Sequence, residues 1–113
     1  MPPWSDDIWT DVARMRTLNM EQSRRQQEMH LCPLQFDICD RVIEQFTMPG
    51  ETVLDPFAGI MSVPYRALLK NRQGIGIELS PRYFWDGCNY LKSAENKTAT
   101  PSLFDLVDTE AAA

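Results

Sequence analysis

The sequence predicts an α/β protein organised around one βαβ unit of a parallel sheet. Two short apolar runs, residues 52–54 and 74–77, are each followed by a carboxylate, Asp55 or Glu78. The segment between the runs has the composition of a helix, and a strand–helix–strand order favours parallel pairing. Ligands of such sheets bind outside the carboxyl ends of the strands, where we expect both acids to lie.

The first 29 residues predict an arm that packs against the rest of the protein. Trp4, Ile8 and Trp9 are large apolar side chains in a short polar setting, which is unusual for a free tail. The basic residues that follow are Arg14, Arg16, Arg24 and Arg25. They fit either a solvated surface or contacts to phosphate.

A helix is expected to begin near Pro33, because proline suits the first helical turn. Its apolar side chains recur every four residues, at Leu34, Ile38, Val42 and Phe46, with Ile43 beside them. This spacing predicts one apolar face, and residues 47–50 end the helix with a turn. His30, just before the helix, fits either a cofactor contact or a structural role.

The remaining elements follow in the order that a βαβ unit requires. Residues 53–54 predict a short buried strand, and a helix is expected over 62–70 with Ala67 and Leu68 facing inward. A second strand is expected at 74–79. Ser80 and a first-turn proline then open a helix that ends near Ser93. Its predicted inward face is formed by Phe84, Cys88 and Leu91.

We therefore divide the chain into an arm over residues 1–29, a binding domain over 30–95 and a tail over 96–113. The tail is polar apart from a short apolar island at Leu103 and Phe104, and we predict that it is disordered. Short islands of this kind can bind a groove on a partner protein.

Composition limits the possible functions. The 113 residues suit one domain, and the net charge of −5 argues against independent binding of nucleic acid. Three cysteines with one histidine form no zinc pattern. We expect reduced thiols in a cytoplasmic protein, no metal, and no membrane segment, since no apolar run approaches 18 residues.

The two acids and the turn between the strands favour an adenosine-type cofactor. Asp55 suits an ammonium group, or it braces the turn that follows it. Backbone N–H groups at the next helix, together with the Ser62 hydroxyl, suit a carboxylate. Glu78 suits the two hydroxyls of a ribose. S-adenosylmethionine has all of these groups, whereas a dinucleotide would favour a Gly-x-Gly-x-x-Gly turn that this chain lacks.

Three segments of the chain resemble motifs of one enzyme family. Residues 30–35, 49–59 and 76–84 are similar, in this order, to the cofactor motifs of DNA methyltransferases that modify adenine N6 or cytosine N4. The motif order resembles the class in which the cofactor half follows the catalytic half. The resemblance implies part of a Rossmann-like class I methyltransferase fold, S-adenosylmethionine as cofactor, and DNA as substrate.

The resemblance also implies a role for each matching residue. Asp55, Phe57, Ala58 and Gly59 would line the methionine part of the cofactor. Ser62 would meet its carboxylate, Glu78 would hold the ribose, and Leu79 would flank the adenine. Pro33, Leu34 and Gln35 would close the pocket from the other side.

The chain departs from the family pattern at two points. Met61 stands where the family has glycine or a similarly small residue, so its side chain either crowds the cofactor carboxylate or bends away. The catalytic tetrapeptide, an Asp, Asn or Ser followed by Pro-Pro and an aromatic residue, has no counterpart. Pro2 and Pro3 precede Trp4, but they follow Met1. The target-recognition region is also missing, so we expect the chain to be inactive alone.

Missing strands would leave residues 53–54 as a bare sheet edge. We expect this edge to be covered by a partner chain, by self-association, or by Trp4, Ile8 and Trp9. An alternative function is a non-enzymatic binding or regulatory module derived from a methyltransferase. The island at Leu103 and Phe104 resembles sliding-clamp-binding peptides but lacks their leading glutamine. An unrelated oxidoreductase is disfavoured by the missing dinucleotide glycines.

Overall fold

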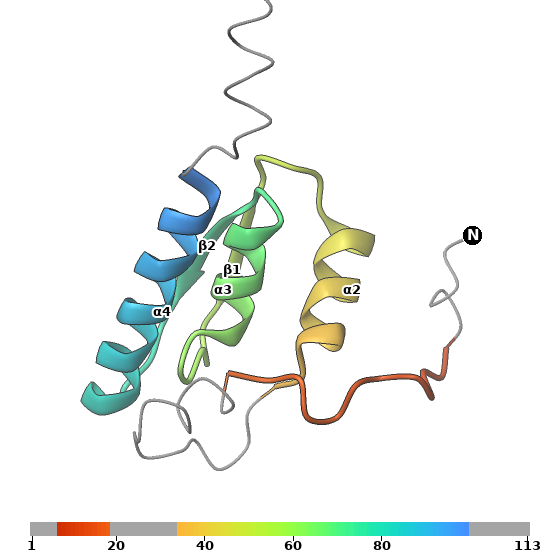
Figure 1. Ribbon diagram of the computed structural model, residues 1–113, viewed down its shortest axis with the longest axis horizontal. Helices are drawn as coiled ribbons and strands as arrows, with labels where there is room; N and C mark the ends of the chain where they lie inside the picture. Colours follow the sequence, from red (N-terminus) through yellow and green to blue (C-terminus); the bar gives the residue numbers. More distant parts are fainter. Residues whose placement is uncertain (1–6, 19–33, 100–113) are drawn as a thin grey trace, which may run out of the picture.

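The computed structural model describes residues 7–18 and 34–99 (Figure 1). The elements follow in the order α2 (Phe36–Phe46), β1 (Thr52–Asp55), α3 (Ser62–Leu69), β2 (Gln73–Gly76) and α4 (Pro81–Ala99). This order confirms the predicted α/β class and the βαβ unit. Within the described ranges, no helix is long and apolar enough to cross a membrane.

β1 and β2 pair in parallel, with Thr52 opposite Gln73 and Asp55 opposite Gly76. Two further backbone hydrogen bonds extend the pairing beyond the carboxyl ends of the strands. Ile77 N–H donates to the Asp55 carbonyl oxygen over 3.0 Å, and Ala58 N–H donates to the Ile77 carbonyl oxygen over 3.0 Å. The two turns that follow the strands are therefore fastened to each other.

The helices occupy one face of this two-stranded sheet. α3 lies centrally, against both strands and between α2 and α4 (Figure 1). The opposite face is open within the described residues, because Leu54, Ile75 and Ile77 are each more than half exposed. The prediction that residues 53–54 form a buried strand is therefore wrong for Leu54. Burial of that side chain needs a second layer.

The N-terminal arm packs on α2, which confirms that residues 7–18 are not a free tail. The Arg16 carbonyl oxygen accepts a hydrogen bond from the Phe36 N–H, in the first turn of the helix, over 2.9 Å. The Asp37 carboxylate accepts a hydrogen bond from the Ala13 N–H over 2.7 Å and another from the Arg16 guanidinium over 2.6 Å. The arm thus satisfies the Phe36 N–H at the start of α2, for which the N-cap residue supplies no side-chain acceptor.

The Ala13 N–H and the Arg16 guanidinium hold the pKa of the Asp37 carboxyl below its usual value. A carboxyl whose pKa is lower in the folded state stabilises the fold above the unfolded-state pKa of about 4. This contribution is lost as the pH falls through the folded-state pKa. The contact between the arm and α2 is therefore sensitive to acid.

α2 is joined to α3 by charged side chains on one side of the contact. Arg66 binds Asp40 through two bonds of 2.7 and 2.9 Å, and its guanidinium lies 4.7 Å from the centre of the Phe36 ring. Lys70 pairs with Glu44 one turn further on. A two-bond arginine–carboxylate pair fixes orientation as well as distance, so these contacts set the angle between the two helices.

The four-residue apolar stripe of α2 is not its buried face, although Ile43, predicted beside the stripe, is buried. The residues that pack under the helix are Cys39 and Ile43, which contact Ala67 in α3, with Val53 and Val63 beside them. The predicted stripe is largely unburied, with Leu34 39%, Val42 44% and Phe46 77% exposed. The four-residue spacing correctly predicted an apolar face, but α3 covers only the side of the helix next to it.

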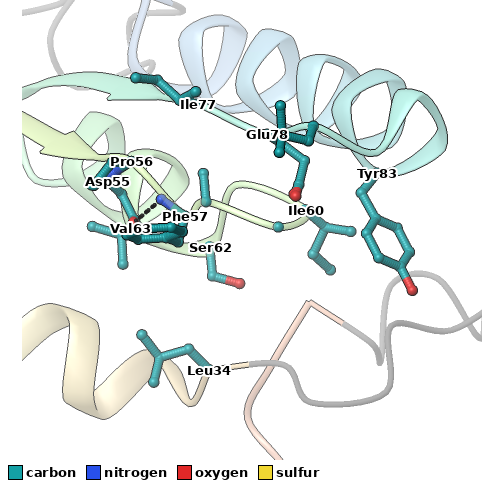
Figure 2. Close-up of a pocket in the computed structure, with 13 residues that line it drawn as sticks. Leu34, Asp55, Pro56, Phe57, Ile60, Ser62, Val63, Ile77, Glu78 and Tyr83 are labelled. Carbon is teal, nitrogen blue, oxygen red and sulfur yellow. Dashed lines mark hydrogen bonds between the residues drawn. The ribbon is translucent and has the colours of Figure 1, made fainter.

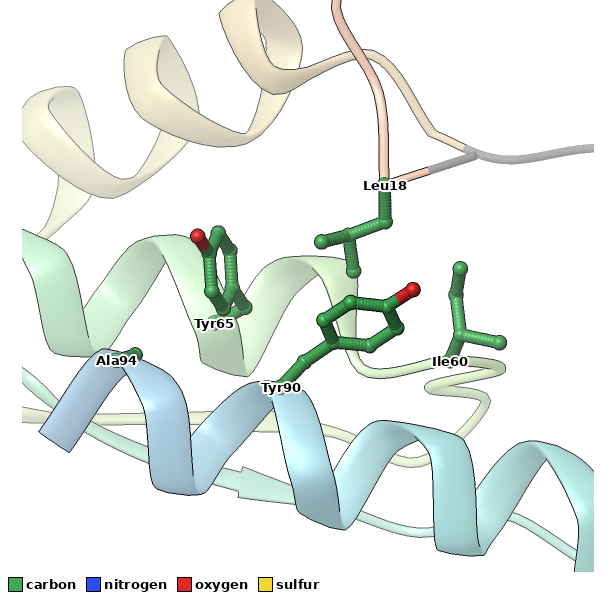
Figure 3. Packing of buried hydrophobic residues seen from close by; sticks show 5 residues of the cluster. All are labelled: Leu18, Ile60, Tyr65, Tyr90 and Ala94. Atoms are coloured by element: carbon green, nitrogen blue, oxygen red, sulfur yellow. The ribbon is translucent and has the colours of Figure 1, made fainter. Parts of the chain in front are cut away.

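A second cluster joins the arm to α3 and α4. Leu18 is fully buried against Ile60, Tyr65, Tyr90 and Ala94 (Figure 3). The two tyrosine rings meet edge to face, with centroids 6.3 Å apart. The arm therefore contributes a core side chain.

α4 differs from its prediction in length and orientation. It ends at Ala99 rather than near Ser93, and its buried residues are Gly87, Tyr90 and Ala94. Phe84 is instead 39% exposed. The helix continues because Ala94 packs under Tyr65 while Lys97 donates a hydrogen bond to the Tyr65 hydroxyl over 3.1 Å.

Replacing Leu18 by alanine should lower the free energy of unfolding by about 2–4 kcal/mol, because the change leaves a cavity in the second cluster. Met15→Ala in the same arm is the matched control, since Met15 is 70% exposed. Urea unfolding of both variants measures the difference. Equal stability of the two variants would show that the arm does not anchor the core.

Burial raises the pKa of the Cys39 thiol to about 12, so at pH 8 only about one thiol in ten thousand is the reactive thiolate. Cys88 is partly exposed. Iodoacetamide at pH 8, with the sites mapped by mass spectrometry, should label Cys88 well before Cys39. Urea should remove the difference, and equal labelling of the folded chain would contradict the packing of α2.

Candidate functional site

A cavity of about 330 Å³ lies at the carboxyl ends of β1 and β2. Its walls are the turn after β1, the start of α3, the turn after β2, and Leu34 on the far side (Figure 2). The volume falls within the usual range for small-molecule sites, and the position is the one that open α/β sheets use for ligands.

The cavity brings together eight of the ten residues that the sequence predicted. These are Leu34, Asp55, Phe57, Ala58, Gly59, Ser62, Glu78 and Leu79. Gln35 lies elsewhere, on a shallow pocket beside the arm. Pro33, His30, Leu103 and Phe104 lie outside the described residues.

Five lining residues were not predicted: Pro56, Ile60, Val63, Ile77 and Tyr83. Four of them are sequence neighbours of a predicted site residue, so their position in the sequence could have identified them. Tyr83 reaches the cavity from the first turn of α4 (Figure 2). Its approach depends on how that helix packs, which the spacing of apolar residues misjudged.

The turn after β1 is held by the last residue of that strand. Asp55 Oδ1 accepts the Phe57 N–H over 3.0 Å (Figure 2). This oxygen braces the turn, which is one of the two roles considered for the acid. Gly59 has a positive φ of 58°, a conformation that glycine adopts without steric cost. At this position the loop therefore presents backbone rather than a side chain to the cavity.

Met61 has a left-handed backbone, with a φ of 72°, and is the N-cap residue of α3. Its side chain is 1% exposed and does not line the cavity. A Cβ atom placed on Gly76 would overlap the Met61 sulfur, and one placed on Gly87 would overlap Met61 Cγ. The methionine thus fills space left by two glycines, on β2 and α4, and bends away from the site.

Glu78 points its carboxylate into the cavity from the turn after β2 (Figure 2). Its Oε2 atom is fully buried and has no hydrogen-bond partner among the described residues. A buried carboxylate oxygen without a donor costs free energy, which makes Glu78 a candidate hydrogen-bond acceptor at this wall of the cavity. Hydroxyl groups of a sugar are donors that suit it.

The opposite side of the cavity is suited to an anionic group. Ser62 is 5% exposed and is the first residue of α3, where helical N–H groups have no partner within the helix. The partial positive charge at this end favours a carboxylate or phosphate. A ligand spanning the cavity would therefore place hydroxyls at Glu78 and an anion near Ser62. No group of three or more potential metal ligands occurs in the described part of the chain.

A model of one protein family matches most of the chain, including every described residue that lines the cavity. The model of the DNA methylase family N6_N4_Mtase matches residues 2–86. The chain therefore belongs to the DNA methylase family.

Two curated proteins illustrate the similarity. The type II methyltransferase M.MthZI of Methanothermobacter thermautotrophicus is 30% identical over 81 residues, which are 71% of this chain and 22% of M.MthZI. The DNA adenine methyltransferase YhdJ of Escherichia coli K12 is 32% identical over 93 residues, which are 82% of this chain and 30% of YhdJ. The chain thus spans less than a third of either relative.

Solved structures share the fold. TTHA0409 of Thermus thermophilus, assigned as a DNA modification methylase, matches with a TM-score of 0.51 and 28% identity. The match covers 55% of this chain and 27% of TTHA0409. TTHA0409 in complex with S-adenosyl-L-methionine matches with a TM-score of 0.52 and 23% identity, over 79% of this chain and 39% of TTHA0409. The α/β elements are therefore part of a class I methyltransferase fold.

Gly87→Ala should lower the free energy of unfolding by about 1–3 kcal/mol, because the added methyl group collides with Met61. Helix propensity alone would change stability in the opposite direction. The loss should shrink when Gly87→Ala is made in a Met61→Ala background, since that change removes the colliding atoms.

Asn89→Ala, at an exposed position in α4, is the control, and it should change stability by less than about 0.5 kcal/mol. Thermal or urea unfolding of the four variants supplies the comparison. An equal loss in both backgrounds would mean that Met61 does not occupy this space.

Proposed function

We propose that the chain is the cofactor-binding half of an amino-methylating DNA methyltransferase and that the cavity binds S-adenosylmethionine. The observation that carries the proposal is a cavity at the carboxyl ends of parallel strands that is lined by Glu78, whose buried Oε2 atom has no donor among the described residues. Membership of the DNA methylase family and the complex of TTHA0409 with S-adenosyl-L-methionine support the choice of ligand.

The residues of the cavity fit the separate groups of this cofactor. Glu78 would accept hydrogen bonds from the ribose hydroxyls, and Leu79, which is 95% exposed, would lie against the adenine. Ser62 and the start of α3 would hold the carboxylate. Asp55, Phe57, Ala58 and Gly59 would surround the methionine chain. Leu34, two residues before α2, would close the cavity from the other side.

When bound, S-adenosylmethionine supplies an electrophilic methyl group. The chain's own part is to bind and orient the cofactor, because the sequence has no counterpart of the catalytic tetrapeptide. The similarity to YhdJ, named as a DNA adenine methyltransferase, favours adenine N6 over cytosine N4 as the acceptor. We propose that DNA is bound only together with a catalytic and recognition part supplied by a partner chain, and that self-association is the alternative way to cover the sheet edge.

The net charge of −5 supports this division of labour, since a protein that grips DNA by itself concentrates lysine and arginine on one surface. The free thiols of Cys39 and Cys88 favour a reducing compartment, and we propose the cytoplasm. The alternative is a binding or regulatory module that keeps the fold without the chemistry.

Calorimetric titration of S-adenosylmethionine into the folded chain tests the cofactor proposal. Glu78→Ala should weaken binding by about tenfold or more, because it removes the acceptor for the ribose hydroxyls. Glu95→Ala, which removes an exposed acid from α4, should leave the affinity unchanged. A folded chain that does not bind the cofactor would contradict the proposal and favour the module.

Tritium transfer from S-adenosylmethionine to mixed-sequence DNA tests the second part. The chain alone should give no transfer above the background of the Glu78→Ala variant. Transfer by the purified chain alone would show that its own residues perform the chemistry.

A further inference from the structure

The cavity has two walls that come from different parts of the chain. On one side, Leu34 stands two residues before α2. On the other side, Ile60 belongs to the loop between β1 and α3, and Tyr83 lies in the first turn of α4. The sheet supports the second wall through the turns that follow its strands, whereas Leu34 lies outside the sheet. The width of the cavity therefore depends on what joins the start of α2 to the opposite wall.

The arm supports the first wall through contacts at the start of α2. The Arg16 carbonyl oxygen accepts the 2.9 Å hydrogen bond from the Phe36 N–H, two residues after Leu34. The Arg16 guanidinium donates to Asp37 over 2.6 Å and lies 5.8 Å from the centre of the Phe36 ring. The arm thus fixes the first helical residues next to Leu34.

Leu18 supports the second wall from behind. Its side chain is completely buried in a cluster with Ile60, which is 1% exposed and also lines the cavity. Tyr83, the cavity residue of α4, packs against the same cluster. In Figure 3, the Leu18 side chain points from the arm toward Tyr90 and Ile60.

One short stretch of the arm therefore contacts both walls. Arg16, at the start of α2, and Leu18, behind Ile60, are two residues apart in the sequence. Two residues of extended chain span at most about 7 Å. Once Leu18 is seated in the cluster, the start of α2 can move only a short distance from the opposite wall without losing its hydrogen bond to the arm.

The other described residues of the arm are bound further along α2. The Arg41 guanidinium lies 5.3 Å from the centre of the Trp9 ring and donates to Asp11 over 2.8 Å. Ile8 is 79% exposed. The expectation that Ile8 and Trp9 cover the sheet edge is therefore wrong, and Trp4 lies outside the described residues.

We propose that Leu18 is a positioning residue for the cofactor site, because it anchors the arm that sets the distance between Leu34 and the opposite wall. The inference rests on the proposed binding of S-adenosylmethionine. It adds a determinant of affinity that lies outside the three segments resembling cofactor motifs. Leu18 is not among the described residues that line the cavity, so it acts through Ile60 and through the start of α2.

The role of Leu18 has a thermodynamic consequence. The apparent affinity of a site is reduced to the fraction of molecules in which the site is formed. Loss of the Leu18 side chain lowers this fraction, because the arm then leaves both walls more often. Since coupling is reciprocal, a bound cofactor should hold the arm in place by the same factor.

Amide hydrogen exchange in the full chain without cofactor tests whether Leu18 anchors the arm. Leu18→Ala should speed exchange of the Phe36 N–H by about tenfold or more, relative to the Ile43 amide inside the same helix. Leu69→Ala trims a leucine that packs on the same cluster from the last residue of α3, and should change this ratio by less than about twofold. An unchanged ratio in Leu18→Ala would overturn the proposal.

Calorimetric titration tests the effect on the site. Leu18→Ala should weaken S-adenosylmethionine by about tenfold, and Leu69→Ala by less than about twofold, at a temperature where circular dichroism shows both variants folded. Leu18→Met, which conserves volume, should restore the affinity. Equal weakening by the two alanine variants would overturn the proposal, because it would reflect a general loss of stability. Leu18→Val should change affinity in the same direction by a smaller factor, and it replaces Leu18→Ala if that variant does not fold.

The reciprocal measurement uses the unmodified chain. Saturating S-adenosylmethionine should slow exchange of the Phe36 N–H by about the factor that Leu18→Ala takes from the affinity. Binding without any change in this exchange would overturn the role of Leu18 while leaving the proposed function intact. A chain that does not bind the cofactor would contradict the proposed function, and the exchange measured without cofactor would still decide whether Leu18 holds the two walls together.

Discussion

Met61 packs against two glycines that lie on different elements, Gly76 at the end of β2 and Gly87 in α4. The loop after β1, the second strand and the last helix meet at this one side chain. Because Met61 is fully buried in a left-handed conformation, it turns the chain into α3 and also holds the loop against the sheet. The cavity keeps its shape because this side chain is placed behind its wall.

The same packing removes the apparent conflict between a long side chain and a cofactor loop. In a protein interior, volume added at one position has to be matched by volume missing elsewhere. Gly76 and Gly87 provide that missing volume. A glycine in the middle of α4 carries a cost in helix propensity, which this packing explains.

The sequence was informative where function depends on local chemistry. The βαβ order and the grouping of Asp55, Ser62 and Glu78 followed from residues that lie next to strand ends and turns. Eight of ten predicted site residues meet in the cavity for the same reason. The boundaries of β1 and α3 were also close, since proline and glycine mark them, but β2 ends at Gly76 rather than at residue 79 as predicted.

Features that depend on packing between distant segments could not be predicted. Leu18 stands in a polar stretch, and its burial is created by Tyr65 and Tyr90, far along the chain. The apolar spacing of α2 identified an apolar face. However, α3 covers the adjacent face of the helix, which carries Cys39 and Ile43, and most of the predicted face stays exposed. Gly87 gave no signal of a buried position, because its role exists only opposite Met61.

Leu34 borders both the cavity and an apolar groove. One side chain, 39% exposed, thus separates the candidate cofactor site from this groove, which has a volume of about 160 Å³ and lies beside α2. If an occupant of the groove shifts Leu34, it changes the affinity of the cavity, and a ligand in the cavity changes the affinity of the groove by the same factor. The segment that leads into α2 would then act as a thermodynamic coupling point, through which binding in the groove and binding in the cavity favour or oppose each other.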